Sequence, residues 1–211
     1  MAKLFLDNFP NHVYRYLDTS GCGRPPISTA TVNKELNIQG YDSYFTVNGF
    51  ANFKDNNSAE IEHCTNLTAF FVDIDGRKDL KELEQIKKLL PPTFIIETKN
   101  GFHVYYLLDE PLYREDMTET EWEEVKKRWN GIEQSLVSKL NGDKNAQDIA
   151  RILRVPDTLY WKKSGDAHTK GIKDVFKIKG IYKELANRYS LDTLEDIFPI
   201  KKDEIISYEK I

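Results

Sequence analysis

Two aspartates close an apolar stretch in the first half of the chain and are the first candidates for chemistry. Asp73 and Asp75 stand two positions apart at the end of residues 67–74, an apolar, β-favouring run typical of a buried central strand. Side chains at this spacing share one face of a strand. Neighbouring carboxylates repel unless a cation bridges them, and such oxygen ligands suit Mg²⁺ or Mn²⁺. The pair indicates a divalent-metal site, with an acidic turn after a buried strand as the alternative.

A second candidate group lies on a predicted β-hairpin. Residues 93–99 and 102–108 flank Asn100-Gly101, the dipeptide that best suits a type I′ turn. A two-residue loop at this position pairs Thr98 with His103. A hydroxyl and an imidazole beside an exposed turn can hydrogen-bond phosphate oxygens, whereas the alternative is a packed histidine paired with a cross-strand threonine. The side chains expected on one face of the sheet are those of Thr98, His103, Ile96 and Tyr105.

A third group follows in residues 147–162. A short helix is predicted over residues 146–154, closed by Pro156, with Asp148, Arg151 and Arg154 on the side opposite its apolar residues. Asp148 and Arg151 can also form an ordinary i, i+3 ion pair. Residues 151–180 contain eight Lys or Arg and three Asp, so they form a local basic patch in a chain whose net charge is -4.

In their order and spacing, the three groups resemble the motifs of the archaeo-eukaryotic primase (AEP) superfamily, and within it the small primase-polymerases of plasmids, mobile elements and CRISPR-linked loci. That family carries an Asp-x-Asp pair, then a Ser-x-x-Gly-x-His-like hairpin, then a single Asp that leads into an Arg-x-Pro-Gly-Thr-x-Asn-x-Lys-like stretch. The matching positions here are Asp73 and Asp75, then Thr98 to His103, then Asp148 with Arg154 to Lys162.

The resemblance implies template-dependent nucleotidyl transfer by a DNA primase-polymerase that extends, and in some members initiates, strands on single-stranded or primed DNA. It implies that Asp73, Asp75 and Asp148 hold two Mg²⁺ or Mn²⁺ ions and that His103 contacts the triphosphate of an incoming dNTP or NTP. No zinc is expected, and priming is expected to need a further domain or a partner protein. The remaining residues expected at the nucleotide are Thr98, Asn100, Arg154 and Lys162.

The sequence departs from the family pattern at three positions. Asp157 stands where the family usually has Gly, Tyr160 where it often has Asn, and Thr98 where Ser is commoner. Asp tolerates turn conformations, so the backbone at position 157 can be retained. Asn48, after the strand predicted over residues 43–47, matches the end of an N-terminal strand of the family and is a candidate nucleotide or template contact, or simply a strand-ending turn.

The elements that must position these residues alternate between strand and helix. After an N-terminal amphipathic segment and a Gly- and Pro-rich loop, a helix is predicted over residues 80–90 and stops before Pro91-Pro92. A capping box from Thr118 to Glu121 starts a long helix that runs to about residue 141. A strand over residues 175–178 and two helical pieces complete the pattern. This pattern predicts an α+β fold with a mixed or antiparallel sheet.

For this α+β chain, the resemblance further implies an AEP-type catalytic core on a sheet like that of an RNA-recognition motif (RRM), joined to an N-terminal αβ module so that the two form one cleft. We expect one catalytic domain over residues 1–211. Within it, residues 1–66 would form the N-terminal module, residues 67–180 the RRM-like core, and residues 181–211 the C-terminal helices and tail.

Composition narrows the classes of protein. The 211 residues are 40% hydrophobic and 30% charged, which excludes a disordered or fibrous chain. Cys22 and Cys64 are too few for a disulfide framework. No apolar run approaches the ~20 residues that span a bilayer, so we expect a cytoplasmic protein with no membrane partner.

Two other functions are compatible with parts of this sequence. Residues 101–106 are similar to the aromatic strand of an RRM, which predicts a single-stranded nucleic-acid-binding module without catalysis. Bare carboxylates at Asp73 and Asp75 would, however, repel a phosphate backbone. A nucleotidyl cyclase like the diguanylate cyclases can also end its first strand in Asp-x-Asp. That family requires a Gly-Gly-Asp/Glu-Glu-Phe hairpin, which this sequence lacks.

Overall fold

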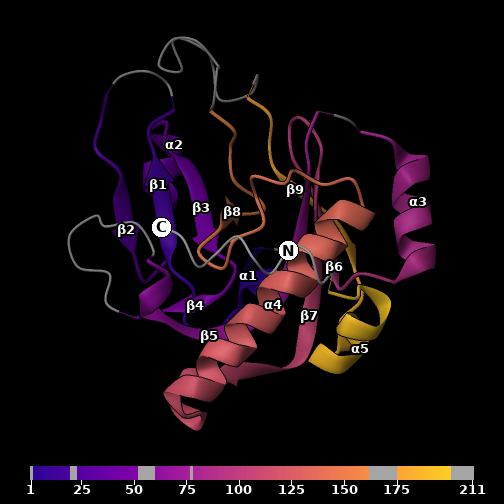
Figure 1. Cartoon of the computed structure of the whole chain (residues 1–211). Coiled ribbons are helices and arrows are strands. Elements are labelled where there is room, and N and C mark those ends of the chain that lie inside the picture. The colour runs from indigo at the N-terminus through magenta and orange to yellow at the C-terminus, as the bar shows by residue number, and fades with distance from the viewer. Residues whose placement is uncertain (1, 20–22, 52–59, 77, 162–174, 201–211) are drawn as a thin grey trace.

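The alternating pattern folds, as predicted, into an α+β protein with two sheets (Figure 1). The structure is a computed structural model and describes residues 2–19, 23–51, 60–76, 78–161 and 175–200. Strands β1, β2 and β3 of the first sheet lie at the left of Figure 1, and the long helix α4 is seen between β4 and β5 on its left and β6 and β7 on its right.

The first sheet has four antiparallel strands in the order β2-β1-β3-β8. The strand predicted over residues 43–47 is confirmed as β3, one residue earlier than expected. The bounds of the four strands are Tyr14–Leu17 for β1, Ile27–Thr29 for β2, Asp42–Thr46 for β3 and Ile152–Arg154 for β8.

The helix predicted over residues 146–154 is wrong, because its last three residues form strand β8. The chain forms turns up to Arg151 and then pairs with β3, so that Arg154 lies opposite Tyr44 and Ile152 opposite Thr46. Without β8, the edge of β3 would present unpaired backbone groups, and pairing with it outweighs a local helical periodicity. The correction moves Arg154 from a helix surface onto a sheet.

The second sheet follows the order β4-β5-β7-β6-β9, with β10 pairing in parallel with β7. The strands predicted over residues 67–74, 93–99 and 102–108 are confirmed with altered ends. Instead of residues 175–178, the next strand is β9, which lies further along the chain because it pairs with β6. The bounds are Gly49–Phe50 for β4, Cys64–Ile74 for β5, Phe94–Glu97 for β6, Phe102–Tyr113 for β7, Lys179–Lys183 for β9 and Arg188–Tyr189 for β10.

The β6–β7 hairpin is confirmed, but its predicted register is wrong by two positions. Ile96 lies opposite His103, where the prediction placed Thr98. Because side chains alternate with a period of two, a shift of two positions leaves each residue of β6 and β7 on its predicted face. Ile96, His103 and Tyr105 therefore still share one face of the sheet.

The type I′ turn predicted at Asn100-Gly101 is also wrong, because neither residue has a positive φ angle. The loop residues are Lys99 and Asn100, and Thr98 and Gly101 close the loop. The N–H of Thr98 donates to the carbonyl of Gly101 at 2.9 Å, and the N–H of Gly101 donates to Oγ1 of Thr98 at 3.0 Å. The threonine hydroxyl replaces a backbone acceptor, which the preference of the Asn-Gly dipeptide does not take into account.

The longest helix starts at the cap that the sequence predicts, and the helix before it starts at a cap that was not predicted. The capping box of Thr118 and Glu121 is present at the start of α4, and Asp79 caps α3. Two helical pieces are predicted near the C-terminal end, but residues 175–200 contain one helix, α5. Among the helices of the described residues, none is both long and apolar enough to cross a bilayer. The bounds are Ala2–Leu6 for α1, Lys34–Ile38 for α2, Leu80–Leu89 for α3, Glu119–Lys139 for α4 and Leu191–Ile197 for α5, with short 3-10 helices at Ile61–His63 and Arg114–Asp116.

Aromatic side chains of the N-terminal segment join the two sheets. The ring of Phe5 lies 5.3 Å from that of Phe45 in the first sheet. On the other side it lies 5.0 Å from Phe94 and 5.1 Å from Tyr105, both in the second sheet. All four side chains are fully buried. This shared core fixes the first sheet relative to the face of the second sheet that carries His103 and Tyr105.

Close packing at Gly142, just after α4, gives a first prediction. A Cβ atom at this position would lie 2.3 Å from Cγ1 of Val72 and 3.3 Å from the carbonyl oxygen of Asp73. Because β5 would have to move, we expect Gly142→Ala to lower the free energy of unfolding by about 1–3 kcal/mol in urea denaturation. Lys144→Ala, at an exposed position of the same loop, is the control. Equal stability of the two variants would contradict this close contact.

Candidate active site

The strand pairing brings together two residues that were predicted from separate motifs. Asp73, near the end of β5, lies directly opposite His103 of β7. The carboxylate Oδ1 of Asp73 is 3.6 Å from Nε2 of His103, which is a close contact but longer than a hydrogen bond. The imidazole is almost entirely buried, while the carboxylate keeps 21% of its surface exposed. The carboxylate is therefore open to a ligand, whereas the neighbouring histidine is shielded from solvent.

The Asp73 carboxyl lies in an environment that disfavours its charge. Its pKa is raised to about 7, first by burial and then by the negative charges of Asp75 and Asp143, whereas Arg151 and Arg154 act in the opposite direction. A carboxyl crowded by other carboxyls is the situation that a bound divalent cation relieves. The electrostatics of the described residues therefore fit the metal ligand that Asp73 is predicted to be.

This raised pKa predicts how stability depends on pH in the metal-free protein. In the unfolded chain the carboxyl titrates near its ordinary value of 3.8, and in the folded protein near 7. Between these values the unfolded state releases a proton that the folded state retains, so Asp73 destabilises the fold progressively as pH rises from about 4 to about 7. We expect the stability of Asp73→Asn, measured in urea relative to wild type, to increase across this range. A difference independent of pH would contradict the burial of this carboxyl.

His103 is held in its neutral form. Its pKa is lowered to about 3, chiefly by burial and then by the positive charge of Arg154. Nδ1 lies 3.4 Å from the hydroxyl of Tyr105 on the neighbouring position of the same face. A neutral imidazole carries one N–H donor and one acceptor, so it can orient a neighbouring oxygen without adding charge. Its predicted contact with a triphosphate remains a prediction.

Asp75 follows β5 and is exposed, and Gly76 turns the chain away with a φ angle of 78°. The predicted Asp-x-Asp pair thus consists of one half-buried and one exposed carboxylate. Their charges act on each other, since Asp75 is the first charged group that raises the pKa of Asp73. The pair lies at the end of β5, and the ligand atoms of the described residues Asp73, Asp75 and Asp148 are not all within 4.8 Å of one another.

The third predicted carboxylate, Asp148, is paired with a base. It lies between α4 and β8, and its Oδ2 is 2.5 Å from Nη2 of Arg151, the i, i+3 pair that the sequence offers as an alternative. Asp143 is the other carboxylate of this loop, and its N–H donates to the carbonyl of Asp73 at 2.8 Å. Sequence reasoning missed Asp143, although its place directly after the predicted end of α4 was available as a signal.

The hairpin loop reaches toward residue Tyr160, which stands where the AEP family often has Asn. Burial raises the pKa of the Tyr160 hydroxyl and the nearby side chain of Asn100 acts against it, while Nζ of Lys99 lies 5.3 Å from the centre of the Tyr160 ring. The hydroxyl of Thr98 instead accepts a bond within the loop itself. Of the nucleotide residues predicted on the hairpin loop, Thr98 therefore makes a bond within the loop, and Asn100 is exposed next to Lys99.

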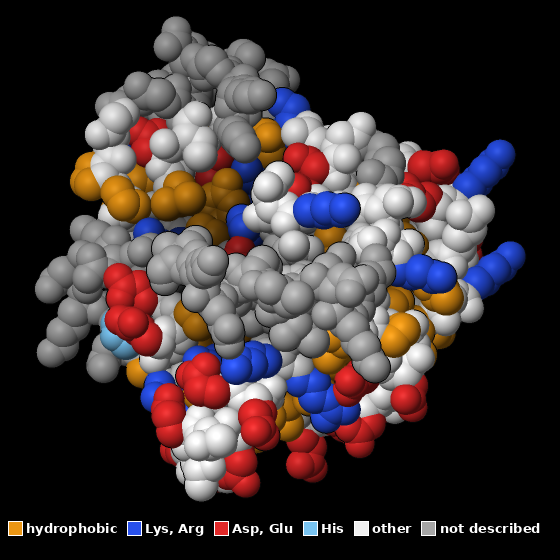
Figure 2. Space-filling model, viewed as in Figure 1, with side chains coloured by type: hydrophobic (Ala, Val, Ile, Leu, Met, Phe, Trp, Pro, Cys, Tyr) orange, Lys and Arg blue, Asp and Glu red, His pale blue; other side chains and the backbone are white. Residues whose placement is uncertain are grey.

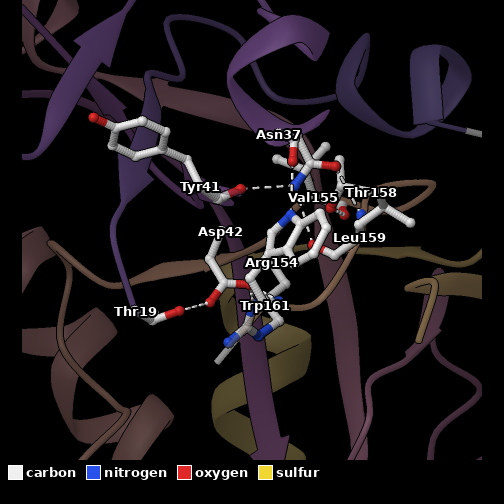
Figure 3. A network of polar contacts seen from close by, with 9 residues as sticks. All are labelled: Thr19, Asn37, Tyr41, Asp42, Arg154, Val155, Thr158, Leu159 and Trp161. Carbon is white, nitrogen blue, oxygen red and sulfur yellow. Dashed lines mark hydrogen bonds and ion pairs between the residues drawn. The ribbon is translucent and has the colours of Figure 1, made fainter. Parts of the chain in front are cut away.

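Arg154 takes part in a buried polar network on the first sheet (Figure 3). Its Nη1 donates to Oδ1 of Asp42 at 2.7 Å, and the N–H of Trp161 donates to the same oxygen at 2.8 Å. The hydroxyl of Thr19 donates to the other oxygen of Asp42. Asn37 holds the following segment, because its carbonyl accepts from Nε1 of Trp161 at 2.6 Å. This network ties β3, α2 and residues 154–161 together.

Two aromatic rings enclose the guanidinium group of Arg154. Its central carbon lies 4.1 Å from the ring centre of Tyr160 and 4.7 Å from that of Tyr44. From this position its charge acts on Asp73 and on His103, which belong to the other sheet. Figure 2 shows a hollow on this side of the molecule, over β3 and β8, where hydrophobic, basic and acidic side chains meet. Arg154 thus contributes positive charge next to the acidic end of β5.

The remaining predicted residues have different places. Asn48 is fully buried, and its amide bonds to backbone groups, accepting from the N–H of Thr68 at 3.0 Å and donating to the carbonyl of Ile149 at 3.2 Å. It therefore packs as a structural residue and is not placed to touch a nucleotide. Asp157 has a φ angle of 63°, a conformation that suits the Gly found there in the AEP family. Lys162 lies outside the described residues, as do residues 163–174 of the basic patch.

A second acidic group lies at the opposite end of β5. Ligand atoms of Glu60, Glu62 and His63 lie within 4.8 Å of one another, and all three residues are exposed. Strand β5 has 11 residues and so spans roughly 35 Å between this cluster and the Asp73 end. The cluster is therefore separate from the candidate site.

Comparison with known proteins identifies the fold. No family model matches the chain, and no curated protein matches its sequence. Among solved structures, the AEP domain of the cyanophage S-2L primase-polymerase matches with 14% identity, a TM-score of 0.70, and coverage of 94% of this chain and 96% of that one. The chain therefore has the fold of an AEP-type primase-polymerase domain, whereas the RRM-like character of its second sheet remains a prediction.

Structures of the primase RepB′ match as well. RepB′ itself has 12% identity and a TM-score of 0.57, covering 91% of this chain and 59% of that chain. Its catalytic domain in complex with initiator DNA has the same identity and TM-score, with coverage of 91% and 88%. At such identities the likeness concerns the fold, and the chemistry has to be argued from the residues of this chain.

Proposed function

We propose that this protein catalyses template-dependent nucleotidyl transfer as a DNA primase-polymerase. The observation that carries the proposal is the acidic end of β5, where Asp73 is crowded by Asp75 and Asp143 beside the neutral His103. This group lies in a fold shared with the cyanophage S-2L primase-polymerase and with RepB′. A nucleic-acid-binding module would gain nothing from carboxylates that repel its ligand.

The carboxylates proposed as ligands are of the chemical type that divalent cations prefer. Asp73, Asp75 and Asp148 would hold Mg²⁺ or Mn²⁺, with Asp143 as the nearest further carboxylate. Bound there, the ions would lower the pKa of an attacking 3′ hydroxyl and offset the charge on the leaving pyrophosphate. Ionisation of Asp73 is favoured once positive charge is present, so cation binding and loss of its proton are coupled.

The chain's own residues would orient the incoming dNTP or NTP. Arg154 and Lys99 place positive charge beside Tyr160, near the carboxylates, where the triphosphate needs it. Asn100 offers an amide from the hairpin loop, and His103 holds a neutral ring under Asp73. Thr98 contributes by shaping the loop, and Lys162 remains a proposed contact of the nucleotide.

Single-stranded or primed DNA is the proposed template. RepB′ provides the precedent, since its catalytic domain is known in complex with initiator DNA. In this chain, residues 151–180 carry the local excess of positive charge that a phosphate backbone requires.

The test is extension of a labelled primer on a longer DNA template by wild-type protein, with Mg²⁺ or Mn²⁺ and with dNTPs or NTPs. We expect template-directed addition that requires the metal. Unprimed templates then distinguish initiation from extension. Binding of single strands with no addition under any of these conditions would overturn the enzymatic proposal and favour a binding module.

The same assay distinguishes between the two candidates for the third carboxylate. Asp143→Asn and Asp148→Asn each remove one charge and keep the shape of the side chain. The greater loss of extension identifies the carboxylate that binds metal, and we propose Asp148 on the resemblance to the AEP family. A greater loss in Asp143→Asn would instead assign the role to the residue that affects the pKa of Asp73 in this structure.

A further inference from the structure

Helix α4 carries a carboxyl that the proposed chemistry does not use. Glu133 is fully buried against β5, and its Oε2 accepts the backbone N–H of Phe71 at 3.3 Å. Its Oε1 is buried and has no hydrogen-bond partner among the described residues. A buried polar side chain is costly to keep, so its position calls for an explanation.

The place where Glu133 contacts β5 supplies an explanation. Beyond its short pairing with β4, the edge of β5 away from β7 is covered by other groups. The N–H of Thr68 donates to Asn48, the carbonyl of Ala69 accepts from Nε1 of Trp129, and the N–H of Phe71 donates to Glu133. The last bond on this edge joins the carbonyl of Asp73 to the loop after α4. Glu133 is thus the last side chain that holds the strand before its acidic end.

The surroundings of Glu133 favour a neutral acid. Burial raises its pKa well above the ordinary range, and the negative charge of Asp148 acts in the same direction, while the N–H of Phe71 acts against it. A neutral carboxyl can accept the N–H of Phe71 through one oxygen. Being neutral, it adds no further negative charge near the carboxylates at the end of β5. An amide can do the same, and a leucine of similar size cannot accept a hydrogen bond at all.

We propose that Glu133 is a positioning residue for nucleotidyl transfer, because its bond to Phe71 fixes the edge of β5 away from β7 and thereby sets the place of Asp73 at the cation site. The inference rests on the proposed function for its chemical meaning. Residues that orient a metal ligand without touching the metal commonly alter metal affinity when they are replaced.

The experiment compares Glu133→Gln with Glu133→Leu in the full chain, with Mn²⁺ affinity measured by electron paramagnetic resonance of the free ion. We expect Glu133→Gln to bind Mn²⁺ within about twofold of wild type and Glu133→Leu to lose at least about tenfold in affinity. The control is Leu136→Ala, a fully buried residue nearby on α4 that makes no side-chain bond to β5. It should lower the thermal midpoint and leave Mn²⁺ affinity unchanged.

Two results would overturn the inference: wild-type affinity in Glu133→Leu, or an equal loss of affinity in Leu136→Ala, which would indicate general loosening of the core. Amide hydrogen exchange across residues 71–74 gives a readout without metal, and we expect it to be faster in Glu133→Leu than in Glu133→Gln. If the wild type binds no Mn²⁺, the proposed function fails. In that case amide hydrogen exchange is the remaining test of the positioning role. Equal protection of residues 71–74 in both variants would exclude that role.

Discussion

Replacing Asp73 and Asp75 together by Asn should abolish metal-dependent primer extension, with a loss of at least about a thousandfold in rate. The reason is chemical, because the two carboxylates supply the negative charge that would hold the cations at the end of β5. Amides of the same shape cannot supply it. The same substitution should make the metal-free protein more stable above pH 7, since it removes a crowded carboxyl whose pKa is raised to about 7.

The opposite directions of the two effects make this variant informative. A variant that merely unfolded would lose both activity and stability, whereas here activity should fall as stability rises. The matched control is Asp109→Asn with Asp116→Asn, which removes two exposed carboxylates elsewhere on the chain. It should extend primers at the wild-type rate. Extension by the Asp73 and Asp75 variant within tenfold of wild type would show that these carboxylates are not the metal ligands.

Features of the fold that follow from local patterning were predictable from the sequence. The capping box at Thr118 and the apolar run before Asp73 gave a helix and a buried strand where the structure has them. The face of the hairpin that carries His103 was also predictable, because a period of two does not change when the register moves by two positions. The register itself was not, since Thr98 closes the loop with its hydroxyl.

Contacts between distant segments account for what the sequence could not supply. Residues 146–154 have a helical periodicity, but pairing of Ile152–Arg154 with β3 decides their conformation. That pairing places Arg154 over Asp42, a partner 112 positions earlier in the chain that no local pattern indicates. Glu133 has the spacing of an ordinary helix residue. Its burial depends on how α4 lies against β5, which is a property of the packed structure.

Replacing Arg154 by Met should destabilise the protein by about 3–5 kcal/mol, because it leaves the fully buried Asp42 without its counter-charge. Met keeps much of the length and the contact with the rings of Tyr44 and Tyr160, so the loss reports mainly on charge. Urea denaturation at pH 7 measures it. A loss below about 1 kcal/mol, the value typical of exposed ion pairs, would contradict the buried pair.

The double variant Asp42→Asn with Arg154→Met separates the structural role of Arg154 from its proposed role at the nucleotide. The amide at position 42 removes the unpaired charge and can still accept the N–H of Trp161, so we expect it to recover at least about half of the lost stability. Asp42 accepts from Nη1 of Arg154, and the proposed role of Arg154 at the triphosphate depends on the other N–H donors of its guanidinium, on a side chain that is 9% exposed. Nucleotide affinity in the primer-extension assay should therefore stay weak, with a KM at least about tenfold above wild type, even where stability is regained. Recovery of both stability and KM would make Arg154 a structural residue and leave the positive charge at the triphosphate to other side chains.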